Sequence, residues 1–145
     1  MPASRLALLL ALLVAGAHAA EFRAAAENAV ILYDAPSTKA RKLFIVNRGY
    51  PLEVVVQVEG WIKVRDATGA LSWAEARSLD NARNVLVRAA AATLRQKPAD
   101  DAPALAELRR DMLLELLDRP AGGWVQVRHR DAGPGFVRVA EIWGE

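Results

Sequence analysis

One histidine and one pair of adjacent acids are the side chains of this sequence that could do acid–base or metal chemistry. His129 is the single histidine after residue 19, and the chain has no cysteine. A catalytic nucleophile needs a base within hydrogen-bond reach, yet His129 lies between Arg128 and Arg130 in a segment typical of a solvated turn. Asp100 and Asp101 occupy a loop, and a metal site would need further ligands beside them. The sequence therefore predicts no catalytic residue, no metal site and no cofactor.

Aromatic side chains beside loops form a second group. Tyr33 and Tyr50 flank loops, and Trp61 and Trp124 each follow a glycine turn. Flat amphipathic rings suit grooves that bind peptides or glycans, but large rings also supply much of the core of a small domain. Both interpretations stay open for the tryptophans. In an alternating strand Trp61 points opposite to Ile62, so Trp61 lies at the rim if Ile62 faces the core.

Two arginines complete the set of candidates. Arg65 and Arg128 follow the tryptophans at the same spacing, with Asp66 and Asp131 close by. Local ion pairing on a solvated strand is the common explanation, and a contact to an acidic peptide or a cell-wall carboxylate is the alternative. The candidate ligand-binding residues are thus Tyr33, Tyr50, Trp61, Arg65, Trp124 and Arg128. We expect both tyrosines and Trp61 to line one groove.

A repeated phrase indicates which elements position these residues. The segment "GWIKVR" begins at residue 60 and "GWVQVR" at residue 123, and the same offset of 63 pairs Trp73 with Phe136. Before the tryptophans the offset is 62, and the glycine turn absorbs the difference. A fixed internal period indicates repeated architecture. We infer two copies of one module, at 30–80 and 88–144.

The first copy has the period of strands, whereas the second copy is ambiguous. "LEVVVQV" (52–58) alternates apolar residues on one face, as a half-buried strand does. "ALAELRRDMLLELLDR" (104–119) has helical spacing and strong helix formers. The repeat register favours strands there, with Asp111 at the place of Gly49, because Asp tolerates a left-handed turn. The predicted fold class is all-β.

The N-terminal residues predict export. Arg5 precedes an apolar run over 6–17, and alanines at 17 and 19 form a small-residue cleavage site. We expect a signal peptide at 1–19 cut after Ala19, no membrane span after cleavage, and a periplasmic protein. A flexible segment at 20–29 and a linker at 81–87 complete the expected organisation. After cleavage 18 basic residues face 17 acidic ones, a balance that gives no reason to expect nucleic acid.

The module motifs resemble a known family. The first copy reads "LYDAPSTKARKL", "NRG", "EVVVQVEGWIKVRDATG" and "SWAEARSL", and the second reads "LRQKPADDAPAL", "GGWVQVRHRDAG" and "GFVRVAEI". These segments resemble the bacterial SH3-like (SH3b) domain, and the whole sequence is similar to exported tandem-SH3 proteins of Gram-negative bacteria. The resemblance implies two tandem small SH3-like barrels. Two departures stand out: Ser72 replaces the glycine before Trp73, and Tyr33 is matched by Arg95 in the first loop.

The resemblance also implies a class of function. Domains of this family often accompany cell-wall hydrolases and target them to peptidoglycan. No hydrolase domain is expected here, so we expect a binding or adaptor module that recognises an envelope protein or a peptide. The alternatives are a peptidoglycan-targeting module and a ligand-free structural protein of the envelope. If the loop after Tyr33 shapes a ligand groove, the two copies should not share one ligand.

Overall fold

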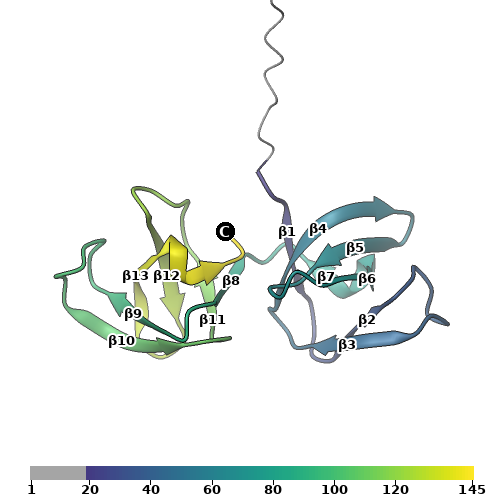
Figure 1. Cartoon of the computed structure of the whole chain (residues 1–145), viewed down its shortest axis with the longest axis horizontal. Coiled ribbons are helices and arrows are strands. Elements are labelled where there is room, and N and C mark those ends of the chain that lie inside the picture. Colours follow the sequence, from purple (N-terminus) through teal and green to yellow (C-terminus); the bar gives the residue numbers. More distant parts are fainter. Residues whose placement is uncertain (1–18) are drawn as a thin grey trace, which may run out of the picture.

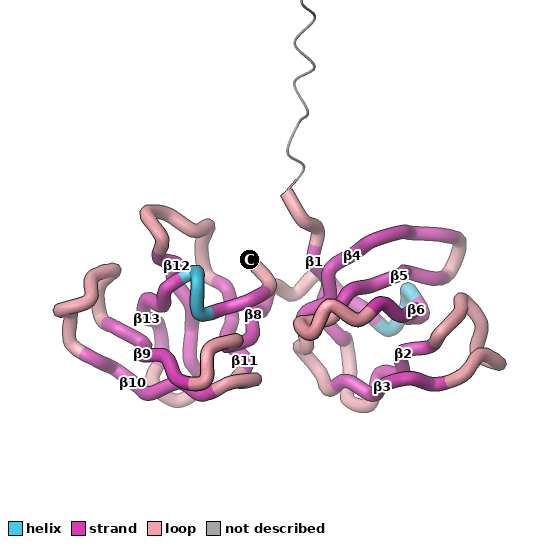
Figure 2. The backbone as a smooth tube through the Cα atoms, in the orientation of Figure 1, coloured by secondary structure: helices cyan, strands magenta, loops and turns pink. Residues whose placement is uncertain are grey.

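The computed structural model describes residues 19–145 as two β-sheet modules that lie side by side (Figure 1). Apart from Ala19, the expected signal peptide lies outside the described residues. Strands and loops make up nearly all of the described chain, with two short 3₁₀ turns between them (Figure 2). The predicted all-β fold class is confirmed.

The first module is a seven-stranded antiparallel sheet in the order β3-β2-β6-β5-β4-β1-β7. Its strands and its 3₁₀ turn are β1 (Phe22–Ala25), β2 (Val30–Tyr33), β3 (Lys42–Val46), β4 (Pro51–Val58), β5 (Trp61–Arg65), β6 (Leu71–Glu75), η1 (Ala76–Ser78) and β7 (Leu79–Asp80). Within the described residues the end strands β3 and β7 are not paired with each other. The module is therefore a bent, sandwich-like sheet rather than the closed barrel we expected.

The second module repeats this sheet in the order β10-β9-β13-β12-β11-β8-β14. Its elements are β8 (Asn84–Val87), β9 (Ala91–Arg95), β10 (Ala104–Arg109), β11 (Leu113–Leu116), β12 (Trp124–His129), β13 (Gly133–Arg138), η2 (Val139–Glu141) and β14 (Ile142–Trp143). Every element thus has a counterpart in the first module, in the same order. The repeat inferred from the tryptophan phrases is the repeat of the fold.

Alternation along the strands builds the core of each module. In β5 the side chains of Ile62 and Val64 are buried while the residues between them are half-exposed. Leu32, Leu52 and Val64 lie in the first core. The residues at the same places of the second module, 62 or 63 positions later, are Leu94, Leu114 and Val127, and they lie in the second core. All six are fully buried aliphatic side chains, and burial of such side chains is the main favourable term in folding.

The segment with helical spacing forms strands, as the repeat register predicted. β10 and β11 occupy most of 104–119, and Asp111 lies between them with φ 68°. Gly49 has φ 86° at the same place of the first module. The left-handed turn is a requirement of the fold, and Asp meets it where the first module uses Gly.

Two segments differ from their prediction. Residues 20–29, expected to be flexible, contain β1, which pairs with both β4 and β7. Residues 81–87, expected to be a linker, contain β8, which pairs with β11 and β14. Each strand gains ladders on both sides, so tertiary pairing stabilises a strand that its own composition does not favour. The connection between the two sheets is reduced to 81–83.

Direct contacts join the two modules. The rings of Phe22 and Trp143 meet edge to face, with centroids 5.2 Å apart. The guanidinium of Arg83 lies 5.6 Å from the Phe22 ring centroid. The side-chain amide of Asn84 donates a hydrogen bond of 2.9 Å to the carbonyl of Gly49. These contacts, defined here as the junction, come from the neighbouring strands β1, β8 and β14.

Candidate functional site

Each module carries a groove at the same place, beside its second strand and the 3₁₀ turn. The first groove has a volume of about 390 Å³ and lies among β2, β6 and η1. Its lining residues are Glu27, Ala29, Val30, Ile31, Tyr33, Glu75, Arg77 and Ser78. Glu75 and Arg77 form an ion pair at 2.8 Å. Apolar and aromatic side chains of β2 therefore form one wall, and a neutralised charge pair forms the other.

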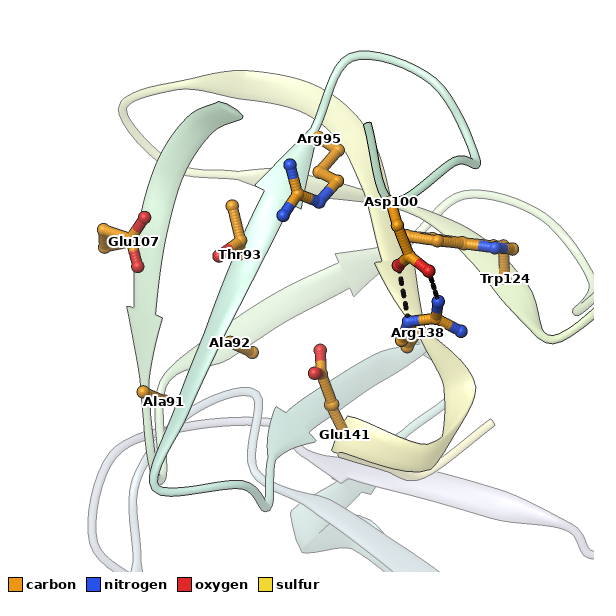
Figure 3. A pocket seen from close by; sticks show the side chains of 9 residues that line it. All are labelled: Ala91, Ala92, Thr93, Arg95, Asp100, Glu107, Trp124, Arg138 and Glu141. Atoms are coloured by element: carbon orange, nitrogen blue, oxygen red, sulfur yellow. Dashed lines mark hydrogen bonds and ion pairs between the residues drawn. The ribbon is translucent and has the colours of Figure 1, made fainter. Parts of the chain in front are cut away.

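The second groove is smaller and carries more charge. It has a volume of about 170 Å³ and is lined by Ala91, Ala92, Thr93, Arg95, Asp100, Glu107, Trp124, Arg138 and Glu141 (Figure 3). Arg138 pairs with Asp100 through two hydrogen bonds at one side. Glu107 extends from β10 at the other side, and Glu141 rises from η2 between them. Five charged side chains thus surround a space where the first groove has three.

Tyr33 and Trp61 come together, as expected. Their rings meet edge to face with centroids 5.5 Å apart, and Tyr33 also lines the first groove. Ile62 faces the core and Trp61 stays half-exposed, so the alternation argument for Trp61 is confirmed. Tyr33 itself is 5% exposed. Tyr33 therefore works as a packed wall of the groove, and Trp61 is the more accessible ring of the pair.

Trp124 has a different role from Trp61, although the two tryptophans are equivalent in the repeat. The guanidinium of Arg138 lies 4.7 Å from the centroid of the Trp124 ring. A guanidinium over a ring face is an attractive contact that also covers that face. Trp124 supports Arg138 at the edge of the second groove and does not offer it an open aromatic platform.

Tyr50 does not share a groove with Tyr33, which corrects our expectation. It lines a cavity of about 300 Å³ between the modules, together with residues of the second module such as Arg110 and Asp111. Burial raises the pKa of the Tyr50 hydroxyl, and the nearby carboxylates of Asp66 and Asp111 add to that rise. The hydroxyl accepts a hydrogen bond of 3.4 Å from the backbone N–H of Ala67. Tyr50 is a residue of the space between the modules.

The two candidate arginines form ion pairs, but not with the aspartates that follow them. Arg65 pairs with Glu53 at 3.0 Å across β5 and β4, and Arg128 pairs with Glu115 at 2.9 Å across β12 and β11. Neither arginine lines a groove. The carboxylate of Asp66 is instead engaged by its own turn, where it accepts hydrogen bonds from the residues that follow it.

His129 stabilises a turn. Its Nδ1 accepts hydrogen bonds from the backbone N–H groups of Asp131 and Ala132, at 3.1 and 3.0 Å. Over 19–145 no group of three or more His, Cys, Asp or Glu side chains is placed to hold a metal ion. In the same range no helix has the length and apolar character to cross a membrane.

Several groove residues were not among the candidates, namely Ile31, Glu75, Glu107, Arg138 and Glu141. One signal in the sequence could have found them. Glu75 and Arg138 occupy equivalent places in the repeat, 63 residues apart, with opposite charge. Positions where two copies of one fold change charge are free of the core, and the grooves lie at such positions.

Comparison with known families decides what these modules are. The bacterial SH3 domain family matches the chain twice, at 26–81 and at 88–144. The chain belongs to the bacterial SH3 domain family. Both matches cover one module of the fold, so the resemblance seen in the motifs is confirmed and each module is a bacterial SH3 domain.

Solved structures give weaker similarities to this pair of SH3 domains. NlpC2 and NlpC1 from Trichomonas vaginalis are 14% and 15% identical, cover 88% and 90% of this chain, and each have a TM-score of 0.40. An NlpC/P60 family protein from Bacillus cereus is 16% identical over 85% of this chain, with a TM-score of 0.39. The chain spans 49%, 48% and 56% of those three chains. Among curated proteins no match is found.

Proposed function

We propose that this chain is a non-catalytic binding protein of the bacterial envelope that recognises a peptide or protein partner through its SH3 grooves. The observation that supports this is the recurrence of the groove. Both modules hollow the same place, beside the second strand and the 3₁₀ turn, while the residues that line it differ. A packing defect would have no reason to recur in two cores that are filled by different side chains.

The first groove offers the features of a peptide site. Peptide and ligand grooves are lined by apolar and aromatic side chains with a few polar groups that fix orientation. Val30, Ile31 and Tyr33 supply the apolar wall, and Ser78 with the Glu75–Arg77 pair supplies the polar groups. Such a lining suits an extended peptide that presents an aliphatic or aromatic side chain.

Export to the envelope belongs to the same proposal. The apolar run over 6–17 and the small residues at 17 and 19 support a signal peptide. The partners that fit this location are an envelope protein, a peptide, or the peptide part of peptidoglycan. Nucleic acid is not among the partners we propose, because acidic and basic residues are nearly balanced.

A ligand-free structural role is the second candidate, and the junction favours it. The Phe22–Trp143 contact and the Asn84–Gly49 hydrogen bond hold the two SH3 domains together across a connection of 81–83. Two domains fixed in this way could act as a spacer in an envelope assembly. This role makes no use of either groove, so groove variants separate it from the binding role.

The test is capture of partners by immobilised protein and by its groove variants. The chain is incubated with envelope extract of a Gram-negative bacterium and, separately, with purified insoluble peptidoglycan. Ile31→Thr places in the first groove the residue type that Thr93 provides in the second. Val55→Thr is the matched control, because Val55 is an exposed strand residue outside both grooves.

The binding role predicts that a partner is retained by the parent chain and by Val55→Thr and is lost with Ile31→Thr. Retention by peptidoglycan with the same dependence would identify the wall as the partner. Retention that Ile31→Thr does not change, or no retention from either source, would contradict the binding role and leave the structural one. Circular dichroism of each variant checks that the sheet content is unchanged.

A further inference from the structure

The second groove contains two carboxylates that nothing in the described chain neutralises. Over 19–145 neither Glu107 nor Glu141 forms an ion pair, and neither carboxylate accepts a hydrogen bond. Both line the same cavity, on opposite elements β10 and η2 (Figure 3). Every other charged group of that groove has a partner, which makes these two the exception.

The remaining charges of the second groove are already engaged. Arg138 is held by the carboxylate of Asp100 and lies over the Trp124 ring. Arg95 donates a hydrogen bond of 2.8 Å from Nη1 to the carbonyl of Ala102. Once the Arg138–Asp100 pair is set aside, two acids face one arginine in the cavity. The groove therefore has an excess of negative charge, combined with guanidinium N–H groups of Arg95 that are free to donate.

The counterpart of this site in the first module has none of these groups. Ile45, Ser78 and Tyr33 stand where the second module has Glu107, Glu141 and Arg95. The shared fold therefore does not require charge at these places. The chemistry of the second groove is an addition to it.

We propose that the second groove binds the ammonium group of a peptide ligand, with Glu107 and Glu141 as its acceptors and Arg95 as donor to a neighbouring carbonyl or carboxylate. An ammonium group has three donors and no acceptor, so it is satisfied by carboxylates that converge from two elements. The small volume admits the end of one side chain or a chain terminus, not a folded surface. This inference rests on the proposed binding function and gives the second SH3 domain its own ligand class.

The ammonium group could come from a lysine-like side chain or from a free peptide N-terminus, and the probes distinguish these sources. Three glycine-based peptides are titrated into the ¹⁵N-labelled chain: one with blocked ends and a central lysine, one with a free N-terminus and no lysine, and one with blocked ends and no lysine. We expect the backbone signals of β9, β10 and η2 to shift with one or both amine-bearing peptides. The fully blocked peptide should cause no such shifts.

Glu107→Gln and Glu141→Gln test the assigned acceptors. Each removes a charge while keeping the shape of the side chain, and each should weaken binding of the amine peptide about tenfold, as expected for a hydrogen bond to a charged group. Glu59→Gln is the matched control, because Glu59 is exposed and lies outside both grooves. Higher salt should weaken binding by the parent chain, since exposed charges are screened.

Equal binding of the blocked and amine-bearing peptides would overturn the proposal, as would parent-like affinity of both glutamine variants. Absence of any shift with all three peptides would also overturn it. None of these outcomes touches the first groove. If Ile31→Thr still abolishes capture of a partner, the proposed binding function stands and this inference alone fails.

Discussion

The two SH3 domains of this chain show which positions of one fold can change and which cannot. At the core positions the residue type is kept, as Leu32 and Leu94 or Val64 and Val127 illustrate. In the grooves it changes, since Tyr33 is matched by Arg95. Burial explains the difference, because a core side chain must fill a fixed volume at high packing density. A groove side chain meets solvent or a ligand and can change its chemistry without cost to the sheet.

The junction differs between the domains for another reason. The two domains meet through unlike surfaces, so each position of the repeat has a different neighbour. Phe22 packs on Trp143, whereas Asn84, its equivalent 62 residues later, donates to the carbonyl of Gly49. The equivalent of Trp143 is Asp80, an exposed residue of β7. Residues that break the repeat at strand edges therefore mark where the two copies touch.

The largest effect is expected from Phe22→Ala. Loss of a largely buried phenylalanine ring, which contacts Trp143 and lies under Arg83, should lower the free energy of unfolding by about 3 kcal/mol. Asn84→Ala at the equivalent position removes one hydrogen bond and should cost only about 1 kcal/mol. Urea denaturation followed by tryptophan fluorescence measures both. Equal small effects would show that the junction does not contribute to stability.

Gly135→Ser is the next largest change and exchanges one copy's residue for the other's. Ser72 occupies this place in the first domain. A Cβ on Gly135 would lie 2.8 Å from Cγ of Leu94 and 2.9 Å from the carbonyl oxygen of Arg95, closer than van der Waals contact. Overpacking of this kind costs about 1–3 kcal/mol. Ala140→Ser, at an exposed site of η2, is the control, and thermal unfolding of both variants is the measurement.

Ser72→Ala tests the same position from the other side. The Ser72 hydroxyl is buried and finds no hydrogen-bond partner among residues 19–145. An unsatisfied buried polar group costs about 1–3 kcal/mol, so alanine should raise the free energy of unfolding by about 1 kcal/mol. Glycine should gain less, because it adds backbone entropy to the unfolded chain. A lower stability of Ser72→Ala would show that the hydroxyl is hydrogen-bonded in solution.

Sequence reasoning recovered the fold from internal comparison more than from local propensity. The segment at 104–119 favours a helix by composition, and only its register against the first copy predicted β10 and β11. Where no such comparison was made, the prediction was wrong. β1 and β8 lie outside the tryptophan register, and "FRAA" in β1 has few β-branched residues. Pairing on both sides stabilises these strands, and that information resides in the sheet order, not in the segment.

The candidate site was recovered in part. Period two correctly told which face of β5 carries Trp61, but it does not tell which strand lies beside that face. Tyr33 reaches Trp61 because β2 pairs with β6, and Tyr50 lies at the far side of the sheet near β1. Glu107 and Glu141 meet because their strands follow the same sheet order. Neighbours across a sheet depend on topology, which a single sequence states only weakly.

A smaller effect is expected at the two equivalent ion pairs. Side-chain exposure is 42% and 24% for Arg65 and Glu53, against 51% and 52% for Arg128 and Glu115. Surface pairs contribute about 0–1 kcal/mol, and less as water screens them more. Double-mutant cycles with alanine should therefore give a larger coupling energy for the first pair. A larger value at Arg128–Glu115 would show that exposure does not control the difference between the domains.

The smallest effect at neutral pH is expected from Tyr50→Phe, and it concerns a site that titrates in one domain only. Burial raises the pKa of Tyr50 in the folded chain, whereas the unfolded value is about 10. The neutral hydroxyl therefore favours the folded state, and this contribution is complete below pH 10 and is lost as the pH rises through the folded pKa. The equivalent residue of the second domain is Met112, which does not titrate. Urea denaturation at pH 8 and at increasing alkaline pH should show the parent chain losing stability faster than Tyr50→Phe. Parallel curves for the two proteins would mean that the space between the domains opens enough to solvate the tyrosinate.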